Sequence, residues 1–217
     1  MEEPFTGPQT MSLPAASIET PSGKNRETEN FPVGSALIRP DLRQHVHAFY
    51  NFARAADDIS DNPLLDPHVK VARLNRFAET LLGATDDVVP AIELRESLRA
   101  TGVSAQHSLD LITAFKRDAT QLRYSDWNDL LDYCRYSASP VGRHVLALHG
   151  VGEAAWPAND ALCSALQVIN HIQDCADDYR ELDRVYLPMD MLMVHGGNPA
   201  ELSREQLTKP MRDTLDA

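Results

Sequence analysis

The spacing of apolar residues is the feature that most limits what this chain can fold into. Between about residue 40 and residue 182, leucine, valine, isoleucine and phenylalanine return every three or four positions, and most runs stop at glycine or proline. That period belongs to an α-helix with one buried face, whereas a half-buried strand alternates every second residue. The sequence shows no convincing alternation of that kind and no internal repeat, so it predicts an all-α fold.

Breaks in this pattern divide the chain into expected helical segments. Asp41 is a candidate cap for the first helix, and Gly83 is a candidate stop for the second. Pro140 and Gly142 interrupt the fifth segment and are expected to bend or split it. The six segments are 39–62, 69–83, 90–102, 104–122, 125–150 and 159–182.

The N-terminal region differs in composition from the rest of the chain. Residues 1–28 are rich in proline, serine, threonine, glycine and glutamate and have no sustained apolar period, which indicates a flexible leader. A chain of 217 residues is long enough for one large buried core. We therefore expect a single helical domain over residues 29–217.

The charge balance and the cysteines narrow the partners and the compartment. The chain has 20 Lys and Arg against 32 Asp and Glu, and this net charge of -12 argues against nucleic acid as a partner. Three cysteines without a C-x-x-C pair suggest neither a disulfide framework nor a thiolate zinc site, so we expect a cytoplasmic protein. No stretch approaches the roughly 20 apolar residues that span a bilayer, so any membrane association would be peripheral. The oligomeric state is left open.

Two acidic clusters carry the strongest chemical signal. Asp57 and Asp61 are four residues apart, and so are Asp174 and Asp178. Four helical residues turn about 400° and rise about 6 Å, so each pair stacks on one face of its helix. Like charges at this spacing destabilise a helix by a few tenths of a kcal/mol, roughly, unless a cation compensates them.

A pair of such clusters favours a magnesium and diphosphate site. Carboxylates are hard oxygen ligands, and Mg²⁺ is typically held by one or two of them together with substrate phosphates and water. Solvated helix ends are the ordinary alternative for one cluster alone. Both clusters follow an apolar helical face, however, and Gln167 and Asn170 continue the face of the second. A calcium loop fits poorly, because neither cluster has alternating ligands around a central glycine.

Three segments, in this order, resemble motifs of the squalene and phytoene synthase family of head-to-head prenyl synthases. YNFARAADDISDN (50–62) resembles its first aspartate motif, and CRYSASPVGR (134–143) resembles its central motif. QVINHIQDCADDYRELDRVYLP (167–188) resembles its second aspartate motif with a trailing R-x-Y-x-P. Three ordered motifs are far more specific than a lone D-x-x-x-D.

Within that family, the resemblance is closest to the bacterial hydroxysqualene synthases of hopanoid biosynthesis. The segment ENFPVGS (29–35) opens the domain, and Gln173 precedes Asp174 where phytoene and dehydrosqualene synthases usually carry arginine. This resemblance implies Mg²⁺-dependent conversion of presqualene diphosphate and water to hydroxysqualene and diphosphate. It also implies a helical bundle around a central apolar cavity, with the family's C-terminal helices lacking after Ala217.

The resemblance also implies roles for individual residues. The positions that match the metal-binding and catalytic aspartates are Asp57, Asp61, Asp174 and Asp178. The positions that match or suit the substrate-binding site are Phe31, Tyr50, Arg54, Tyr133, Gln167, Asn170, Arg184 and Tyr186. One residue more than usual separates Asp178 from Arg184, which departs from the family pattern.

Two other functions stay open at this point. A squalene or phytoene synthase-like enzyme would instead condense two prenyl diphosphates. A non-catalytic helical protein would bind prenyl lipids, or a partner subunit, without turnover. Assays with each diphosphate substrate separate the first two, and binding without turnover would identify the third.

Overall fold

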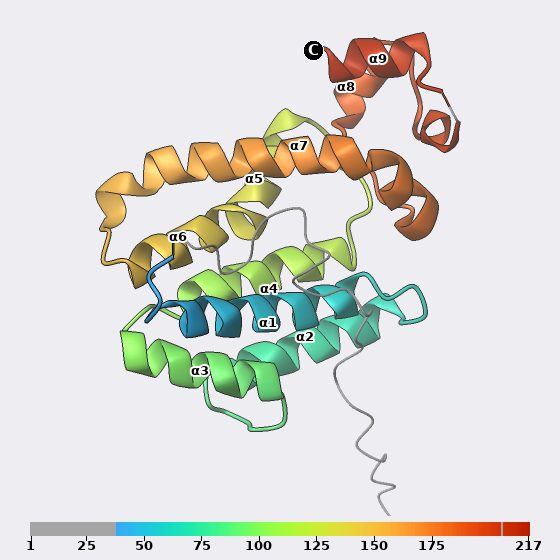
Figure 1. Ribbon diagram of the computed structural model, residues 1–217. Helices are drawn as coiled ribbons and strands as arrows, with labels where there is room; N and C mark the ends of the chain where they lie inside the picture. Colours follow the sequence, from blue (N-terminus) through green and yellow to red (C-terminus); the bar gives the residue numbers. More distant parts are fainter. Residues whose placement is uncertain (1–37, 205) are drawn as a thin grey trace, which may run out of the picture.

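Helices account for nearly all regular structure in residues 38–204 and 206–217, the part of the chain that the computed structural model describes (Figure 1). In those residues the β-structure is limited to one isolated bridge between Arg123 and Val185, so the all-α prediction is confirmed. The predicted leader, 1–28, and Phe31 lie outside the described residues. The longer helices are α1 (Arg43–Ser60), α2 (Pro67–Leu81), α3 (Val89–Thr101), α4 (Gln106–Asp118), α5 (Trp127–Ser137), α6 (Ser139–Leu148) and α7 (Trp156–Leu182). Shorter elements are η1 (Glu153–Ala155), α8 (Met189–Val194), η2 (Pro199–Ser203) and α9 (Lys209–Leu215).

Local side chains explain several helix ends. The Asp66 carboxylate accepts a hydrogen bond from the His68 amide, and Pro67 fills the first turn of α2. Gly102 ends α3 with a φ of 73°, a conformation that costs glycine little. The prediction that Asp41 caps α1 is wrong, because α1 begins after Leu42 without a side-chain cap and Asp41 pairs with Arg39 at 2.6 Å.

The expected interruption of the fifth segment is confirmed. The chain divides at Ala138 into α5 and α6, and Pro140 lies in the first turn of α6, where its missing N–H costs nothing. Gly142 then lets α6 approach α7 closely. A Cβ atom at this position would meet the Asn159 side chain and lie 2.6 Å from Cys163 Sγ.

The main core lies between the first four helices. Phe52 of α1 and Phe77 of α2 are completely buried, and their ring centroids are 5.7 Å apart. Leu74, Leu94 and Ile112 bring in the faces of α2, α3 and α4. The apolar faces of these four helices are therefore buried against one another, as their periodicity predicts.

The long helix α7 lies across α5 and α6 on the other side of the molecule (Figure 1). Its 27 residues correspond to about 40 Å of helix. Only His171 and Cys175 are buried along it, whereas Leu162 is 61% exposed and Leu166 is 53% exposed. The short helices α8 and α9 follow beyond its C-terminal end. Within the described residues, no helix is both long and apolar enough to cross a membrane.

Candidate active site

The two acidic clusters lie at the C-terminal ends of α1 and α7, and Arg184 stands between them. Arg184 follows α7 and donates from Nη1 to Asp61 Oδ1 of α1 at 2.9 Å, across 123 residues of sequence. Only 4% of Arg184 is exposed. This ion pair connects the first aspartate motif to the R-x-Y-x-P segment, which places the predicted Arg184 at the predicted site despite the extra residue before it.

Asp118, which the sequence reasoning missed, is a buried residue of this site next to Arg184. It is the last residue of α4, is 4% exposed, and accepts hydrogen bonds from Tyr133 Oη at 2.8 Å and Tyr186 Oη at 2.9 Å. Arg184 Nη2 also donates to the Asp118 carbonyl at 3.0 Å. Asp118 lies in KRDATQ, without a second carboxylate four residues away, so no spacing signal distinguishes it from a surface aspartate.

Aromatic rings pack together beside Asp118. The Tyr186 ring stacks on His171 of α7 with centroids 3.6 Å apart, and lies 5.3 Å from Tyr124 and 5.4 Å from Tyr133. Gln167 holds His171 through a 3.1 Å contact between Nε2 atoms. Thus the predicted residues Tyr133, Gln167 and Tyr186 meet in one cluster, joined by His171, to which the sequence analysis gave no role.

The predicted residues on α1 are arranged around an arginine. Arg54 forms ion pairs with Asp57 at 2.9 Å and with Asp58 at 2.5 Å, and its side chain is 16% exposed. Tyr50, one turn earlier, is half-buried. Arg54 is therefore held beside the first aspartate motif, with its charge already shared between two carboxylates. Asp58, between the two predicted aspartates, is mostly buried at 7% exposure.

Three carboxyl groups of the site have raised pKa values, because burial disfavours their charged forms. Burial and the nearby Asp61 raise the pKa of Asp57 well above its usual range, although Arg54 opposes this. Burial raises the pKa of Asp178 to about 7, with Arg184 opposing and Asp174 adding to the rise. Burial likewise raises the pKa of Asp118 to about 6. Such shifts mean that the ionised site would gain from an additional cation.

The donor set fits a hard divalent cation that arrives with an anionic ligand. Carboxylate oxygens are the ligands that Mg²⁺ prefers, and the raised pKa values show that their charge is not fully compensated. Over residues 38–204 and 206–217, however, no three His, Cys, Asp or Glu side chains are grouped closely enough to hold a metal by themselves. Asp174 and Asn170 are exposed on α7. The four aspartates as metal ligands therefore remain a prediction, in which phosphate oxygens would complete the coordination.

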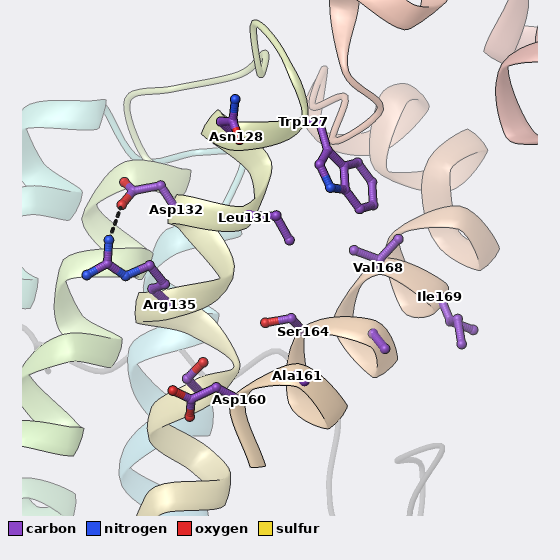
Figure 2. Close-up of a pocket in the computed structure, with 12 residues that line it drawn as sticks. Trp127, Asn128, Leu131, Asp132, Arg135, Asp160, Ala161, Ser164, Val168 and Ile169 are labelled. Atoms are coloured by element: carbon purple, nitrogen blue, oxygen red, sulfur yellow. Dashed lines mark hydrogen bonds and ion pairs between the residues drawn. The ribbon is translucent and has the colours of Figure 1, made fainter. Parts of the chain in front are cut away.

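A groove of about 830 Å³ runs beside this cluster between α5 and α7 (Figure 2). Trp127 and Leu131 line it from α5, and Val168 and Ile169 line it from α7. Val168 also packs against the tyrosine cluster, so the groove adjoins the polar site. Trp127 was missed by sequence reasoning. Phe49, next to the predicted Tyr50, is a core residue whose ring centroid lies 3.9 Å from that of His144.

The squalene/phytoene synthase family model matches residues 24–217. The chain belongs to this family. Among characterised members, a hydroxysqualene synthase from Rhodopseudomonas palustris is 47% identical over 191 residues, and one from Zymomonas mobilis is 45% identical over 197 residues. These alignments cover 88% and 90% of this chain, and 65% and 66% of the relatives. This family member therefore spans slightly less than two thirds of the length of these relatives.

Other family members show how far the likeness extends. A chloroplast phytoene synthase from Daucus carota is 28% identical over 198 residues, covering 86% of this chain and 49% of the relative. The crystal structure of a squalene synthase from Alicyclobacillus acidocaldarius superposes with a TM-score of 0.76 at 32% identity, covering 88% of this chain and 73% of that one. The predicted fold class, a helical prenyl-synthase bundle, is thereby confirmed.

Proposed function

We propose that this chain carries out the Mg²⁺-dependent conversion of presqualene diphosphate and water to hydroxysqualene and diphosphate. The observation that carries this proposal is the difference in identity within the family. Hydroxysqualene synthases are 45 to 47% identical to this chain, whereas the carrot phytoene synthase is 28% identical over a similar span. The chain aligns with slightly less than two thirds of the length of these relatives, so their reaction is assigned to it as a proposal.

The diphosphate would bind where the two aspartate motifs meet Arg184. Bound Mg²⁺ would neutralise the diphosphate charge as the leaving group departs. Arg184, held by Asp61 and the Asp118 carbonyl, is positioned to donate to phosphate oxygens in a direction fixed before the ligand arrives. Arg54 would do the same from α1 by sharing its charge with the incoming phosphate.

The carbon chemistry needs a dry, electron-rich surface. The bond between carbon and the diphosphate oxygen breaks with its electron pair leaving on the diphosphate, and the resulting cyclopropylcarbinyl cation opens. Water then adds through its oxygen and loses a proton to give the alcohol. The buried cluster of Tyr124, Tyr133 and Tyr186 packs against Val168 of the groove and would help to exclude water from the cation. The apolar groove between α5 and α7 would hold the hydrocarbon chains (Figure 2).

The test is incubation of the purified chain with presqualene diphosphate, with and without Mg²⁺, followed by mass spectrometry of the extracted lipids. We expect Mg²⁺-dependent hydroxysqualene that is lost in Asp57→Asn. The control is Asp177→Asn, because Asp177 is not part of the Asp174 and Asp178 pair, is exposed and pairs with Arg180. Absence of hydroxysqualene from the unmodified chain would contradict the proposed reaction.

A condensing activity is the second candidate, and the squalene synthase of known structure supports keeping it in the test. Incubation with farnesyl diphosphate instead of presqualene diphosphate distinguishes the two. Formation of presqualene diphosphate or squalene from farnesyl diphosphate would replace the first proposal. Binding of either diphosphate without any product would favour the non-catalytic prenyl-binding alternative.

A further inference from the structure

Lys70 is a cation near the aspartate site that neither the motifs nor the proposed function uses. It lies in the first turns of α2, and its Nζ donates to the Ser60 carbonyl, at the C-terminal end of α1, at 2.7 Å. Ser60 is completely buried, and its hydroxyl contacts Asp57 O at 2.9 Å and Asp61 Oδ1 at 3.3 Å. Lys70 therefore reaches the first aspartate motif from a different helix.

The contact fixes the position of the ammonium group. A lysine on an open surface samples many rotamers, whereas a hydrogen bond to a buried carbonyl holds Nζ at one place. An ammonium group has three donors, and the described residues give Lys70 this one hydrogen bond and no carboxylate within ion-pair distance. Two donors thus remain for another acceptor.

The charges around Lys70 show which acceptor would suit it. Burial and Arg184 lower the pKa of Lys70, whereas Asp61 and Asp118 oppose this effect. Lys70 and Arg184 are therefore two cations held near one another at the C-terminal end of α1, where Lys70 contacts Ser60 and Arg184 pairs with Asp61. Arg184 is already paired with Asp61, whereas Lys70 has no carboxylate at ion-pair distance among the described residues, so an incoming anion would supply the partner that Lys70 lacks.

We propose that Lys70 is a further phosphate-binding residue of the site, and that it contacts the diphosphate from α2 while Arg184 contacts it from beyond α7. This inference rests on the proposed diphosphate site but not on the reaction performed there. It gives α2 a role in ligand binding, although α2 carries neither aspartate motif. The chemical class of the ligand is a diphosphate ester or free diphosphate.

The probe for this proposal is inorganic pyrophosphate, titrated calorimetrically into the purified chain in the presence of Mg²⁺. A charge-assisted hydrogen bond contributes about 1.5–3 kcal/mol, so Lys70→Met should weaken pyrophosphate binding by about tenfold or more. Lys70→Arg keeps the charge and should retain most of the affinity. The matched control is Lys116→Met, because Lys116 is a similarly half-buried lysine on α4 whose pKa is lowered by burial alone.

Each outcome separates this proposal from its rivals. Unchanged pyrophosphate affinity in Lys70→Met would overturn the proposal. It would also be overturned if Lys70→Met and Lys70→Arg lost the same affinity and the same unfolding temperature, because that result would indicate a purely structural contact. Failure of the unmodified chain to bind pyrophosphate would overturn both this proposal and the diphosphate site. Weakened binding in Lys70→Met, together with no hydroxysqualene from the unmodified chain, would keep Lys70 as a ligand and reject the reaction.

Discussion

The bundle α1–α4 and the long helix α7 have the same kind of sequence and opposite environments. In the bundle, apolar residues such as Phe52, Leu74 and Phe77 have no exposed surface. On α7, Leu162, Leu166 and Ile169 recur at the same helical spacing and are each at least half exposed. Periodicity therefore predicts a helix equally well in both places, but it does not say which stripe is buried within this chain.

The candidate site lies where these two regions meet. The bundle contributes Asp57, Asp61 and Asp118, and α7 with the segment after it contributes Asp178 and Arg184. Polar contacts make the connection at this end, together with the packing of Tyr186 against Ala114 of α4 in one cluster. The bundle should therefore respond to mutation as a packed core does, the junction as a buried ion pair does, and the outer face of α7 as a surface does.

The largest effect is expected inside the bundle. Phe77→Ala removes a completely buried ring that packs against Phe52, and it should lower the free energy of unfolding by about 3–5 kcal/mol. Urea unfolding followed by circular dichroism measures this change. A loss below about 1 kcal/mol would mean that the bundle is not the stable half of the molecule.

A somewhat smaller effect is expected at the junction. Arg184→Met leaves Asp61 without its ion-pair partner and the Asp118 carbonyl without its donor, so the loss of stability should be about 3 kcal/mol. Arg180→Met is the matched control on the same stretch of chain. The Arg180 and Asp177 side chains are 50% and 70% exposed, and losing their ion pair should cost less than about 1 kcal/mol. Similar losses in both variants would contradict a special role for the junction.

The buried His144 should make the bundle side of α6 sensitive to acid. Burial, together with His107 and His45, lowers the pKa of His144 to about 3, and its ring is stacked on Phe49. In the unfolded chain its pKa is about 6.5, so the unfolded state binds the proton first as the pH falls. The contribution of neutral His144 to the free energy of unfolding therefore has its full value above pH 6.5. Between about pH 6.5 and 3 it falls by up to about 1.4 kcal/mol per pH unit.

Unfolding free energies measured at several pH values, for the unmodified chain and for His144→Phe, test this dependence. The variant replaces the imidazole with an apolar ring against Phe49, and its stability should fall less steeply between pH 6.5 and 4. His149→Phe is the control, since His149 is only partly buried and its Nδ1 contacts the Val145 carbonyl at 2.9 Å. Parallel curves for the chain and His144→Phe would contradict the prediction.

The smallest effect is expected on the outer face of α7. Leu166 is 53% exposed, so Leu166→Ala should change the free energy of unfolding of this chain by less than about 0.5 kcal/mol. The comparison with Phe77→Ala is direct, because both changes shorten an apolar side chain at helical spacing. A loss near that of Phe77→Ala would show that the α7 face is covered in solution.

Much of the site was accessible from sequence because its aspartates come in pairs. The spacing of Asp57 with Asp61, and of Asp174 with Asp178, is visible without a structure and predicts two carboxylate faces. The R-x-Y-x-P resemblance added Arg184 and Tyr186, which the structure places against Asp61 and Asp118. Whether the four aspartates bind metal stays a prediction.

Other parts of the site had no sequence signal. Asp118 is a single aspartate at the end of an amphipathic helix, and Lys70 is a single lysine in another, so each looks like an ordinary surface charge until its neighbours are known. His171 also carries no distinguishing spacing, and only the stack on Tyr186 shows that it borders the site. Asp41 is the opposite case. Its residue type and position predict a helix cap, but its carboxylate pairs with Arg39 instead.

By itself the sequence determined that the chain is helical, where most helices end and which carboxylates share a face, because these properties depend on neighbours within about four residues. The tertiary structure decided which apolar stripes are buried, and that Arg184 and Asp118 complete the site. These depend on contacts between residues 66 and 123 positions apart. Burial and Coulomb interactions act through space, so local spacing carries no record of which distant charge or face will lie opposite.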